Sequence, residues 1–308
     1  NEMEIKMEEL IQKIERLKKE NDFVILAHYY VDGAVQDIAD YVGDSFYLSK
    51  VATKVEAKNI LFAGVSFMGE SAKLLNPEKH VYMADVTADC PMAHMVTVDR
   101  IKEVKEQYDD VAVVCYVNST AEIKAVSDVC VTSSNAIKVV KNIENKRIFF
   151  VPDNNLGRYV AKQLPEKEFI FNDGFCHVHK SIDPELVKEA KEHHPDALVL
   201  AHPECTEDVL ELADYIGSTA GILDYATESD CKKFIICTEM GIFFKLSKQN
   251  PDKKFYSVGH RQFCPNMKKV SLEKVADVME NPMEEVILPD DIMDEACKPL
   301  QKMLELAK

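Results

Sequence analysis

The chain has 308 residues, a formal net charge of −16 and 46% hydrophobic residues. Its length suffices for two or three compact domains, and the acidic balance argues against a nucleic-acid binder, which usually shows a basic patch. No apolar run approaches the roughly 18 residues of a membrane span. The nine cysteines are widely spaced without a C-x-x-C pair, which argues against a disulfide framework, a zinc ribbon or a bacterial ferredoxin run.

The predicted elements alternate between helix and strand along the chain. Residues 1–20 form a charged amphipathic helix without the apolar core of a signal peptide, so we expect a cytoplasmic protein. Apolar runs of strand length follow at residues 23–27, 59–64, 80–84, 111–116, 147–151, 168–171, 197–201, 233–237 and 254–258. Because these runs are apolar rather than alternating, they predict parallel sheets covered on both faces, with about three strands each.

The helical patterns lie between these strands. In the first unit, Val35, Ile38, Ala39 and Val42 share one face of a predicted helix, and a second helix begins at Ser45. The final segment, residues 271–308, has two further helical patterns.

Three segments of the chain repeat one another. Residues 24–45, 113–133 and 198–219 align on the anchors His28, Tyr116 and His202, which are separated by 88 and 86 positions. The positions two residues after the anchors hold Tyr30, Asn118 and Glu204. An aspartate follows each anchor by 12 positions (Asp40, Asp128 and Asp214), and a hydroxyl residue follows it by 17 (Ser45, Ser133 and Thr219). A period near 87 is too long for a solenoid repeat and has the size of a small domain.

The repeat predicts three homologous α/β/α sandwich domains that pack around a shared centre. Their predicted ranges are residues 1–97, 98–181 and 182–270. Residues 271–308 lie outside the repeat, and we expect this segment to pack back on the first domain.

The second half of each unit ends on a cysteine. Cys90, Cys176 and Cys264 follow their anchors by 62, 60 and 62 residues, and they alone share the repeat phase. Three thiolates from three units suit a [4Fe–4S] cluster in which one iron lacks a protein ligand and can act as a Lewis acid. A three-thiolate zinc site is the alternative. We expect the other cysteines to be buried apolar residues (Cys115, Cys130, Cys231, Cys237 and Cys297) or, for Cys205, a residue without a counterpart in the other units.

The hydroxyl residues of the repeat have two interpretations. Ser45, Ser133 and Thr219 each precede a helical run, so each can be an N-cap. Helix N-termini also present free amides to anions, so three converging starts would form a pocket for carboxylate and phosphate groups.

The anchors follow strands of a parallel sheet, where ligands of α/β proteins bind. Together with the residues two positions later, they provide acid–base and hydrogen-bonding groups. His179 lies three residues after Cys176 and is a further candidate near the thiols. Glu70 and Asn154 follow the second predicted strand of their units and are candidates to line the same pocket.

The motifs AHYY with QDIADYVGDS, GVSFMGE, CYVNST, VTSSNA, PDNNLGRYV, CHVH, AHPEC, ADYIGST and CPNMKK resemble those of the quinolinate synthase family, in the same order from about residue 20 to residue 308. The resemblance implies a transferase of NAD (pyridine nucleotide) biosynthesis that condenses iminoaspartate with dihydroxyacetone phosphate, with loss of phosphate and two waters, to give quinolinate. It implies three domains in a pseudo-threefold arrangement around a central active site. The partners implied are these two small molecules, together with an enzyme that supplies iminoaspartate.

The resemblance also implies roles for individual residues. Cys90, Cys176 and Cys264 match the ligands of a [4Fe–4S] cluster with one iron lacking a protein ligand. Tyr30 and Glu204 match residues assigned to acid–base work, and His28 and His202 would orient hydroxyl and carbonyl oxygens. The substrate contacts of the family match His28, Ser45, Tyr116, Val117, Asn118, Ser133, His202, Pro203, Glu204 and Thr219.

Two other functions are compatible with parts of the pattern. An iron–sulfur hydro-lyase of the aconitase type also uses three cysteines and one open iron, but it would act on a hydroxy acid without a phosphate substrate. A repeat scaffold or metal-storage protein would leave the polar anchors without a role.

Overall fold

The computed structural model describes residues 1–308, which form three four-stranded parallel sheets. The first sheet contains β1 (Phe23–His28), β2 (Tyr41–Gly43), β3 (Asn59–Ala63) and β4 (His80–Met83). The second contains β5 (Val111–Tyr116), β6 (Val129–Val131), β7 (Arg147–Val151) and β8 (Glu168–Phe171). The third contains β9 (Leu198–Ala201), β10 (Tyr215–Ile216), β11 (Lys233–Cys237) and β12 (Lys254–Tyr256).

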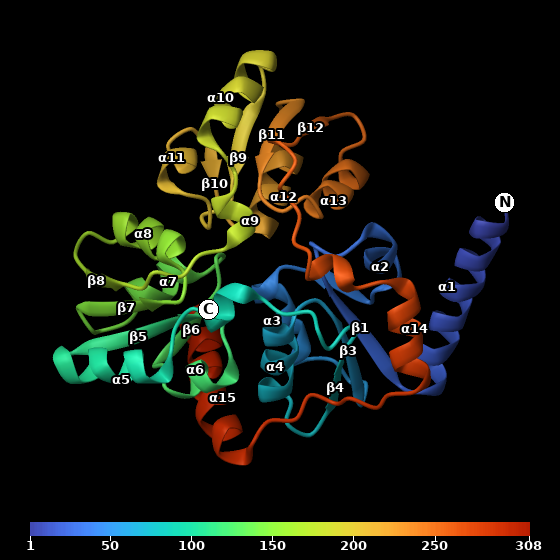
Figure 1. Cartoon of the computed structure of the whole chain (residues 1–308), viewed down its shortest axis with the longest axis horizontal. Helices are drawn as coiled ribbons and strands as arrows, with labels where there is room; N and C mark the ends of the chain where they lie inside the picture. The colour runs from blue at the N-terminus through green and yellow to red at the C-terminus, as the bar shows by residue number, and fades with distance from the viewer.

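The three sheets have the same topology. Their strand orders are β2-β1-β3-β4, β6-β5-β7-β8 and β10-β9-β11-β12. The repeat in the sequence is therefore a repeat of structure, and the predicted fold class of three α/β units is confirmed. Figure 1 shows the three units arranged around a common centre, with the sheets separated by their helices.

The connecting segments are mostly helical. The first unit has α1 (Glu2–Glu20), α2 (Gly33–Ile38), α3 (Ser45–Ala52) and α4 (Ser66–Leu75). The second has α5 (Val98–Gln107), α6 (Ala121–Ala125), α7 (Ala136–Lys141), α8 (Asn154–Gln163) and α9 (His177–Lys180). The third has α10 (Pro184–His193), α11 (Glu207–Leu210), α12 (Thr219–Glu228) and α13 (Ile242–Gln249), and the chain ends with α14 (Leu272–Glu280) and α15 (Asp290–Leu306). Two 3-10 turns lie at Pro91–His94 and Met267–Lys269.

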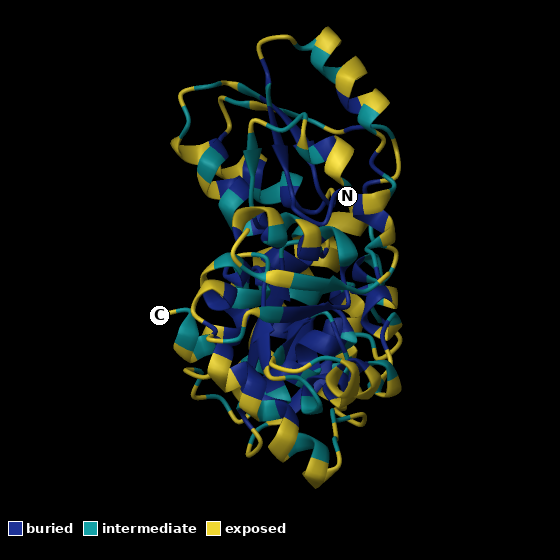
Figure 2. Cartoon of the chain, turned by 90° about the vertical axis from the view of Figure 1, so that its left-hand side faces the viewer, coloured by how far each residue is buried: buried dark blue, intermediate teal, exposed yellow.

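The central strands form because their apolar residues are covered on both faces. All six residues of β1 are buried, as are five of the six in β5. Figure 2 shows the buried residues concentrated in the strands and the exposed ones on the outer helices. The buried apolar residues of the first two units and of α14 and α15 form one continuous cluster, whereas the third unit has two clusters of its own. The centre therefore lies between two units that share a core and a third that packs separately.

Each sheet has four strands, one more than the sequence predicts. The additional strands, β2, β6 and β10, have only two or three residues each, which is too short to recognise as an apolar run. Asp40, Asp128 and Asp214 precede these short strands, and each bonds twice to the neighbouring strand. The carboxylate oxygens accept from the amides of Ile25, Val113 and Val199 at 2.8, 2.7 and 2.8 Å, and the aspartate amides donate to the same three residues' carbonyls. The aspartates of the repeat therefore hold the edge strand in register.

A second set of equivalent side chains repeats with the same spacing in the three units. Lys79, Lys167 and Lys253 are separated by 88 and 86 positions, and each ammonium group donates to two or three backbone carbonyls 22 to 27 residues earlier in the chain. Because buried carbonyls need a donor, these lysines fasten the segment after α3, α7 and α12 to the last strand of the unit.

Some boundaries differ from the sequence-based expectations. The predicted helix that includes Val42 ends at Ile38, because Ala39 is extended and Val42 belongs to β2. In the C-terminal segment, α14 lies against α1, whereas α15 lies mainly against α6, β6 and α4, at the junction of the first two units. The exact domain boundaries stay predictions. None of the helices has the length and apolar character needed to cross a membrane.

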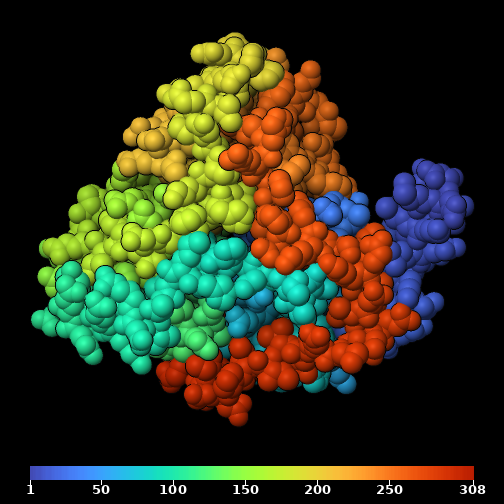
Figure 3. Space-filling model, in the orientation of Figure 1, coloured from blue at the N-terminus to red at the C-terminus, as the bar shows by residue number.

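The space-filling view in Figure 3 has three lobes, from which the N-terminal part of α1 projects. Residues 2–9 of α1 are exposed, and the helix is anchored to the body through Ile14 and Leu17.

Candidate active site

A cavity lies at the centre, where the carboxyl ends of the three sheets meet. It contains about 750 Å³ of space between its lining atoms, part of it open to solvent. The sequence-predicted residues that line it are His28, Tyr30, Ser45, Cys90, Tyr116, Asn118, Ser133, Cys176, His179, His202, Glu204, Thr219 and Cys264. They come from all three units, so the three repeated segments do contribute to one site.

Four other candidates lie elsewhere. Val117 and Pro203 are buried beside the anchors but do not line the cavity, so their predicted substrate contacts stay predictions. The expectation that Glu70 and Asn154 line it is wrong. Glu70 lies in a separate groove, and the Asn154 side chain accepts a hydrogen bond from Arg158 on the next turn of α8.

The two anchor histidines have the same geometry. Nδ1 of His28 accepts from the backbone N–H of Tyr30 at 3.1 Å, and Nδ1 of His202 accepts from that of Glu204 at 3.1 Å. Burial lowers the pKa of both imidazoles from about 6.5 to about 3. Both rings are therefore neutral near pH 7 with the proton on Nε2, which leaves Nε2–H as a hydrogen-bond donor for an oxygen in the cavity.

The hydroxyls of the repeat are not helix caps. Ser45 and Thr219 are the first residues of α3 and α12, and the caps are the preceding residues. Asp44 accepts from the amide of Tyr47, and Ser218 accepts from that of Gly221. Because the capping bonds are already made, the side chains of Ser45 and Thr219 remain at the cavity wall, beside helix N-termini that favour anions.

A chain of hydrogen bonds crosses the site from the first unit to the second. The Tyr30 hydroxyl lies 2.8 Å from the hydroxyls of both Thr219 and Thr238, and Thr238 lies 2.8 Å from Nε2 of His179. Nδ1 of His179 lies 3.0 Å from Oε2 of Glu204, whose Oε1 accepts from the Tyr116 hydroxyl. Such a chain can move a proton between its two ends.

The pKa values along this chain are shifted in opposite directions. Burial would raise the pKa of Glu204, but His179 and His202 and the hydrogen bonds from His179 and Tyr116 outweigh it and hold this pKa below its usual range. Burial and the charge of Glu204 raise the pKa of Tyr30 and of Tyr116 well above the usual 10. Near pH 7, therefore, Glu204 is ionised and both tyrosines keep their protons.

The three repeat thiols have a common local setting. Each precedes a short helical turn, and backbone N–H groups of that turn, including the one three residues after the cysteine, donate to the sulfur. Burial raises the pKa of Cys90 to about 12, and it also raises those of Cys176 and Cys264. A bound metal would displace these thiol protons, and the N–H groups would then stabilise the thiolates. All nine cysteines are free. Cys115, Cys130 and Cys237 are buried as expected, and Cys205 is buried too, whereas the expectation is wrong for Cys231 and Cys297, which are only partly buried.

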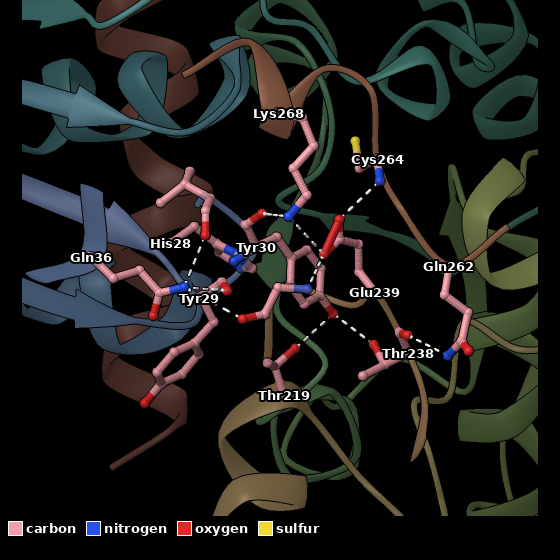
Figure 4. Close-up of polar contacts among 12 residues, drawn as sticks. His28, Tyr29, Tyr30, Gln36, Thr219, Thr238, Glu239, Gln262, Cys264 and Lys268 are labelled. Atoms are coloured by element: carbon pink, nitrogen blue, oxygen red, sulfur yellow. Dashed lines mark hydrogen bonds and ion pairs between the residues drawn. The ribbon is translucent and has the colours of Figure 1, made fainter. Parts of the chain in front are cut away.

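Figure 4 shows side chains that the sequence analysis missed, around Glu239. This buried carboxylate lines the cavity and accepts from the amides of Cys264, at 2.8 Å, and of Gly241, at 2.5 Å. Lys268 lies 3.4 Å from the same carboxylate and donates to the Tyr30 carbonyl at 2.6 Å. These contacts join the loop of the third thiol to the loop of Tyr30 in the first unit.

The repeat offset could have indicated Glu239. It lies two residues beyond β11, as Asp153 lies two beyond β7 and Val65 two beyond β3, again with spacings of 86 and 88. Glu239 and Asp153 are carboxylates but Val65 is apolar, so a search for side chains that match in all three units passes over this position.

The cavity wall contains no lysine or arginine. Lys124 is fully buried, and its ammonium group donates to the carbonyls of Val117 and Ser119 at 2.8 and 2.6 Å. It therefore fixes the loop that presents Asn118. An anionic ligand must be held at the wall by neutral donors and helix N-termini.

Comparisons with known proteins agree with this arrangement. The family model described as "Quinolinate synthetase A protein" matches residues 12–305. The chain belongs to this family. It is 55% identical to the quinolinate synthase of Fusobacterium nucleatum over 295 residues, which cover 96% of this chain and 98% of that protein. It is 49% identical to the quinolinate synthase of Clostridioides difficile over 300 residues (97% and 99%) and 46% identical to that of Aquifex aeolicus over 306 residues (98% and 95%).

The predicted family is thereby confirmed over nearly the whole chain. The cavity of this family member has hydrogen-bond donors for anions, an ionised carboxylate, protonated tyrosines and a group of side chains able to bind metal. That combination suits acid–base chemistry on small anionic molecules.

Proposed function

We propose that the chain is a quinolinate synthase, a transferase that condenses iminoaspartate with dihydroxyacetone phosphate to give quinolinate, phosphate and two waters. Membership of the family supports the reaction. At the level of residues, the proposed reaction is supported by one cavity, at which the polar anchors, hydroxyls and thiols of all three units lie together.

We propose that Cys90, Cys176 and Cys264 hold a [4Fe–4S] cluster. The donor set fits this group, because the three thiols line one cavity, come from three different units and each have backbone N–H donors to sulfur. When bound, a cluster with three protein ligands supplies one iron able to act as a Lewis acid toward a substrate oxygen.

The substrates carry carboxylates and a phosphate, and the cavity offers neutral donors for them. We assign Ser45 and Thr219 to these groups because both hydroxyls lie at the N-termini of helices of eight or more residues. Ser133 and Asn118 contribute the corresponding donors from the second unit. The Nε2–H groups of His28 and His202 would orient hydroxyl and carbonyl oxygens, since neither ring is charged near neutral pH.

Proton transfer is assigned to the hydrogen-bonded chain between Tyr30 and Glu204. Glu204, ionised, accepts the proton released as the enamine carbon attacks the carbonyl. Tyr30, protonated, is placed to donate toward a leaving hydroxyl and to recover a proton through Thr238 and His179. The two ends have pKa values displaced in opposite directions, which is the usual division between an acid and a base in one site.

The proposal places the reaction in the cytoplasm, where nine free cysteines are stable, and it makes a separate enzyme the source of iminoaspartate.

The test is an anaerobic assay of the cluster-loaded chain. Iminoaspartate, generated from oxaloacetate and ammonia, is supplied with dihydroxyacetone phosphate, and quinolinate and phosphate are both quantified. We expect equal amounts of the two products, and none when dihydroxyacetone phosphate is left out. A fully loaded protein that forms no quinolinate would refute the proposal, and dehydration of a hydroxy acid without a phosphate substrate would favour a hydro-lyase.

A further inference from the structure

Three metal-binding side chains converge at one wall of the cavity in a set that differs from the three thiols. The sulfur of Cys176, Nδ1 of His179 and a carboxylate oxygen of Glu204 all lie within 4.8 Å of one another. Nδ1 of His179 is 3.2 Å from the sulfur and 3.0 Å from Oε2 of Glu204. His179 and Glu204 are 2% and 5% exposed, whereas Cys176 is only partly buried.

The local structure explains the convergence. Cys176 caps α9, and His179 lies three residues later on the same turn, so both side chains project from one face of the helix. Glu204 comes from the loop after β9 in the third unit. Figure 1 shows α9 at the junction of the second and third units, where the two segments meet.

The surrounding contacts are those of a metal site. Nε2 of His179 is 2.8 Å from the Thr238 hydroxyl, and the other oxygen of Glu204 accepts from the Tyr116 hydroxyl. Metal-binding histidines and carboxylates are usually held in this way through the atom that does not bind the ion. The sulfur of Cys176 and an oxygen of Glu204 both face Nδ1, so a metal ion between the three atoms would be bound by all of them.

We propose that the chain without its cluster binds one divalent ion of the zinc type at Cys176, His179 and Glu204. A tetrahedral zinc ion needs ligand atoms about 3.3–3.8 Å apart, given zinc bonds of about 2.0–2.3 Å. Nδ1 is already close to this distance from both other atoms, and the sulfur and the carboxylate oxygen, which lie within 4.8 Å of each other, would adjust as the ion binds. Sulfur and nitrogen donors select zinc, cobalt or ferrous iron over magnesium and calcium. All three residues line the cavity, which leaves the fourth position of the ion open to water or an anion.

The same ion would exclude the iron–sulfur cluster, because Cys176 cannot serve both. This second part rests on the proposed function, whereas the ion site itself does not. The chain would therefore have two mutually exclusive metal states that share one cysteine.

Cobalt titration of the metal-free, anaerobic chain tests the site. We expect one Co²⁺ per chain, with the strong visible bands of a four-coordinate ion and the charge-transfer absorption of a single thiolate. Cys176→Ser should abolish the charge-transfer band, and His179→Ala and Glu204→Gln should each weaken binding about 10-fold or more. Cys90→Ser and Cys264→Ser are the matched controls, which should bind Co²⁺ as the wild type does.

Loss of cobalt binding in Cys90→Ser would overturn the proposal, because it would place the ion on the three thiols instead. Binding that survives in Cys176→Ser would overturn it too. Cys176→Ser and Glu204→Gln are nearly isosteric, and a circular dichroism spectrum like that of the wild type excludes misfolding as the cause of lost binding.

Competition is tested separately. Chain preloaded with Zn²⁺ should take up little iron and sulfide in a reconstitution that loads the zinc-free chain fully, and adding a chelator should restore uptake. Full loading with zinc retained would contradict mutual exclusion. If the zinc-free chain also fails to assemble a cluster, the proposed cofactor is wrong while the cobalt result stands.

Discussion

At the start of each edge strand, Asp40, Asp128 and Asp214 accept a hydrogen bond from the neighbouring strand at nearly the same distance, 2.8, 2.7 and 2.8 Å. At the cavity, the positions two residues after the anchors are a tyrosine, an asparagine and a glutamate. Both sets belong to the same repeat. The aspartates are identical because each unit has the same backbone to fasten, and the cavity residues differ because an asymmetric reaction needs different groups.

The thiols are intermediate between these two regions. They are identical in type, like the aspartates, yet they line the cavity, like the anchors. A cluster with three equivalent protein ligands would have the threefold symmetry of the repeat. The comparison thus separates three classes of residue. The first, here called the frame, bonds to backbone groups and includes the repeated aspartates and lysines; the second would hold the cluster, and the third would act on substrates. Each class should respond differently to substitution.

The largest effect is expected at the thiols. Cys90→Ala, Cys176→Ala and Cys264→Ala should each abolish cluster assembly and activity, because each removes one of three ligands to one cluster. Visible absorbance and turnover of anaerobically reconstituted protein measure both. Cys130→Ala and Cys297→Ala are the controls outside the cavity and should keep the colour. A Cys264→Ala protein that retains full absorbance would remove that residue from the ligand set.

The next effect is expected at Glu204. Glu204→Gln should keep the cluster and lower turnover by about 10²–10⁴-fold, the usual contribution of a positioned acid or base. The amide has nearly the same shape and can still accept from Tyr116, so a loss would come from the missing negative charge. Steady-state kinetics of quinolinate formation provide the measurement, and activity like that of the wild type would assign the proton transfer to another group.

A smaller effect concerns stability at acid pH. The pKa of His28 and of His202 falls from about 6.5 in the unfolded chain to about 3 in the folded one. Between these values the unfolded chain binds protons that the folded chain does not, so stability falls as the pH decreases below 6.5. The slope is about 1.4 kcal/mol per pH unit for each histidine. In urea unfolding of the metal-free chain, His28→Gln should flatten this dependence, and an unchanged slope would contradict the assignment.

The smallest effect is expected in the frame. Lys167→Met should destabilise the chain by about 1 kcal/mol, because the partly buried carbonyls of Ile143 and Asn145 lose their donor. Activity per folded molecule should not change, since this lysine does not line the cavity. Lys79→Met is the matched variant in the first unit. A fall in turnover without a fall in stability would show that the frame and the cavity are not separable.

The sequence was sufficient for what the repeat preserves. A constant offset from His28, Tyr116 and His202 located the hydroxyls of the cavity, and a nearly constant one located its thiols. Unbroken apolar runs located the central strands of three parallel sheets. Both inferences depend on features that every unit shares.

What the sequence did not show has a physical reason in each case. The edge strands have two or three residues, too few to form a recognisable apolar run, and they exist because a neighbouring aspartate fastens them. Glu239 corresponds to the carboxylate Asp153 in the second unit but to the apolar Val65 in the first, and Lys268 contacts Tyr30 across 238 positions of chain. Contacts made only by folding leave no local pattern.

The central claim is that one thiol from each unit contributes to a single cluster site. The most direct test is a count of iron and acid-labile sulfide in the anaerobically purified chain. We predict about four of each per chain, as a [4Fe–4S] cluster requires. An absence of both iron and sulfide, in protein that holds no zinc and has never been exposed to air, would contradict the claim.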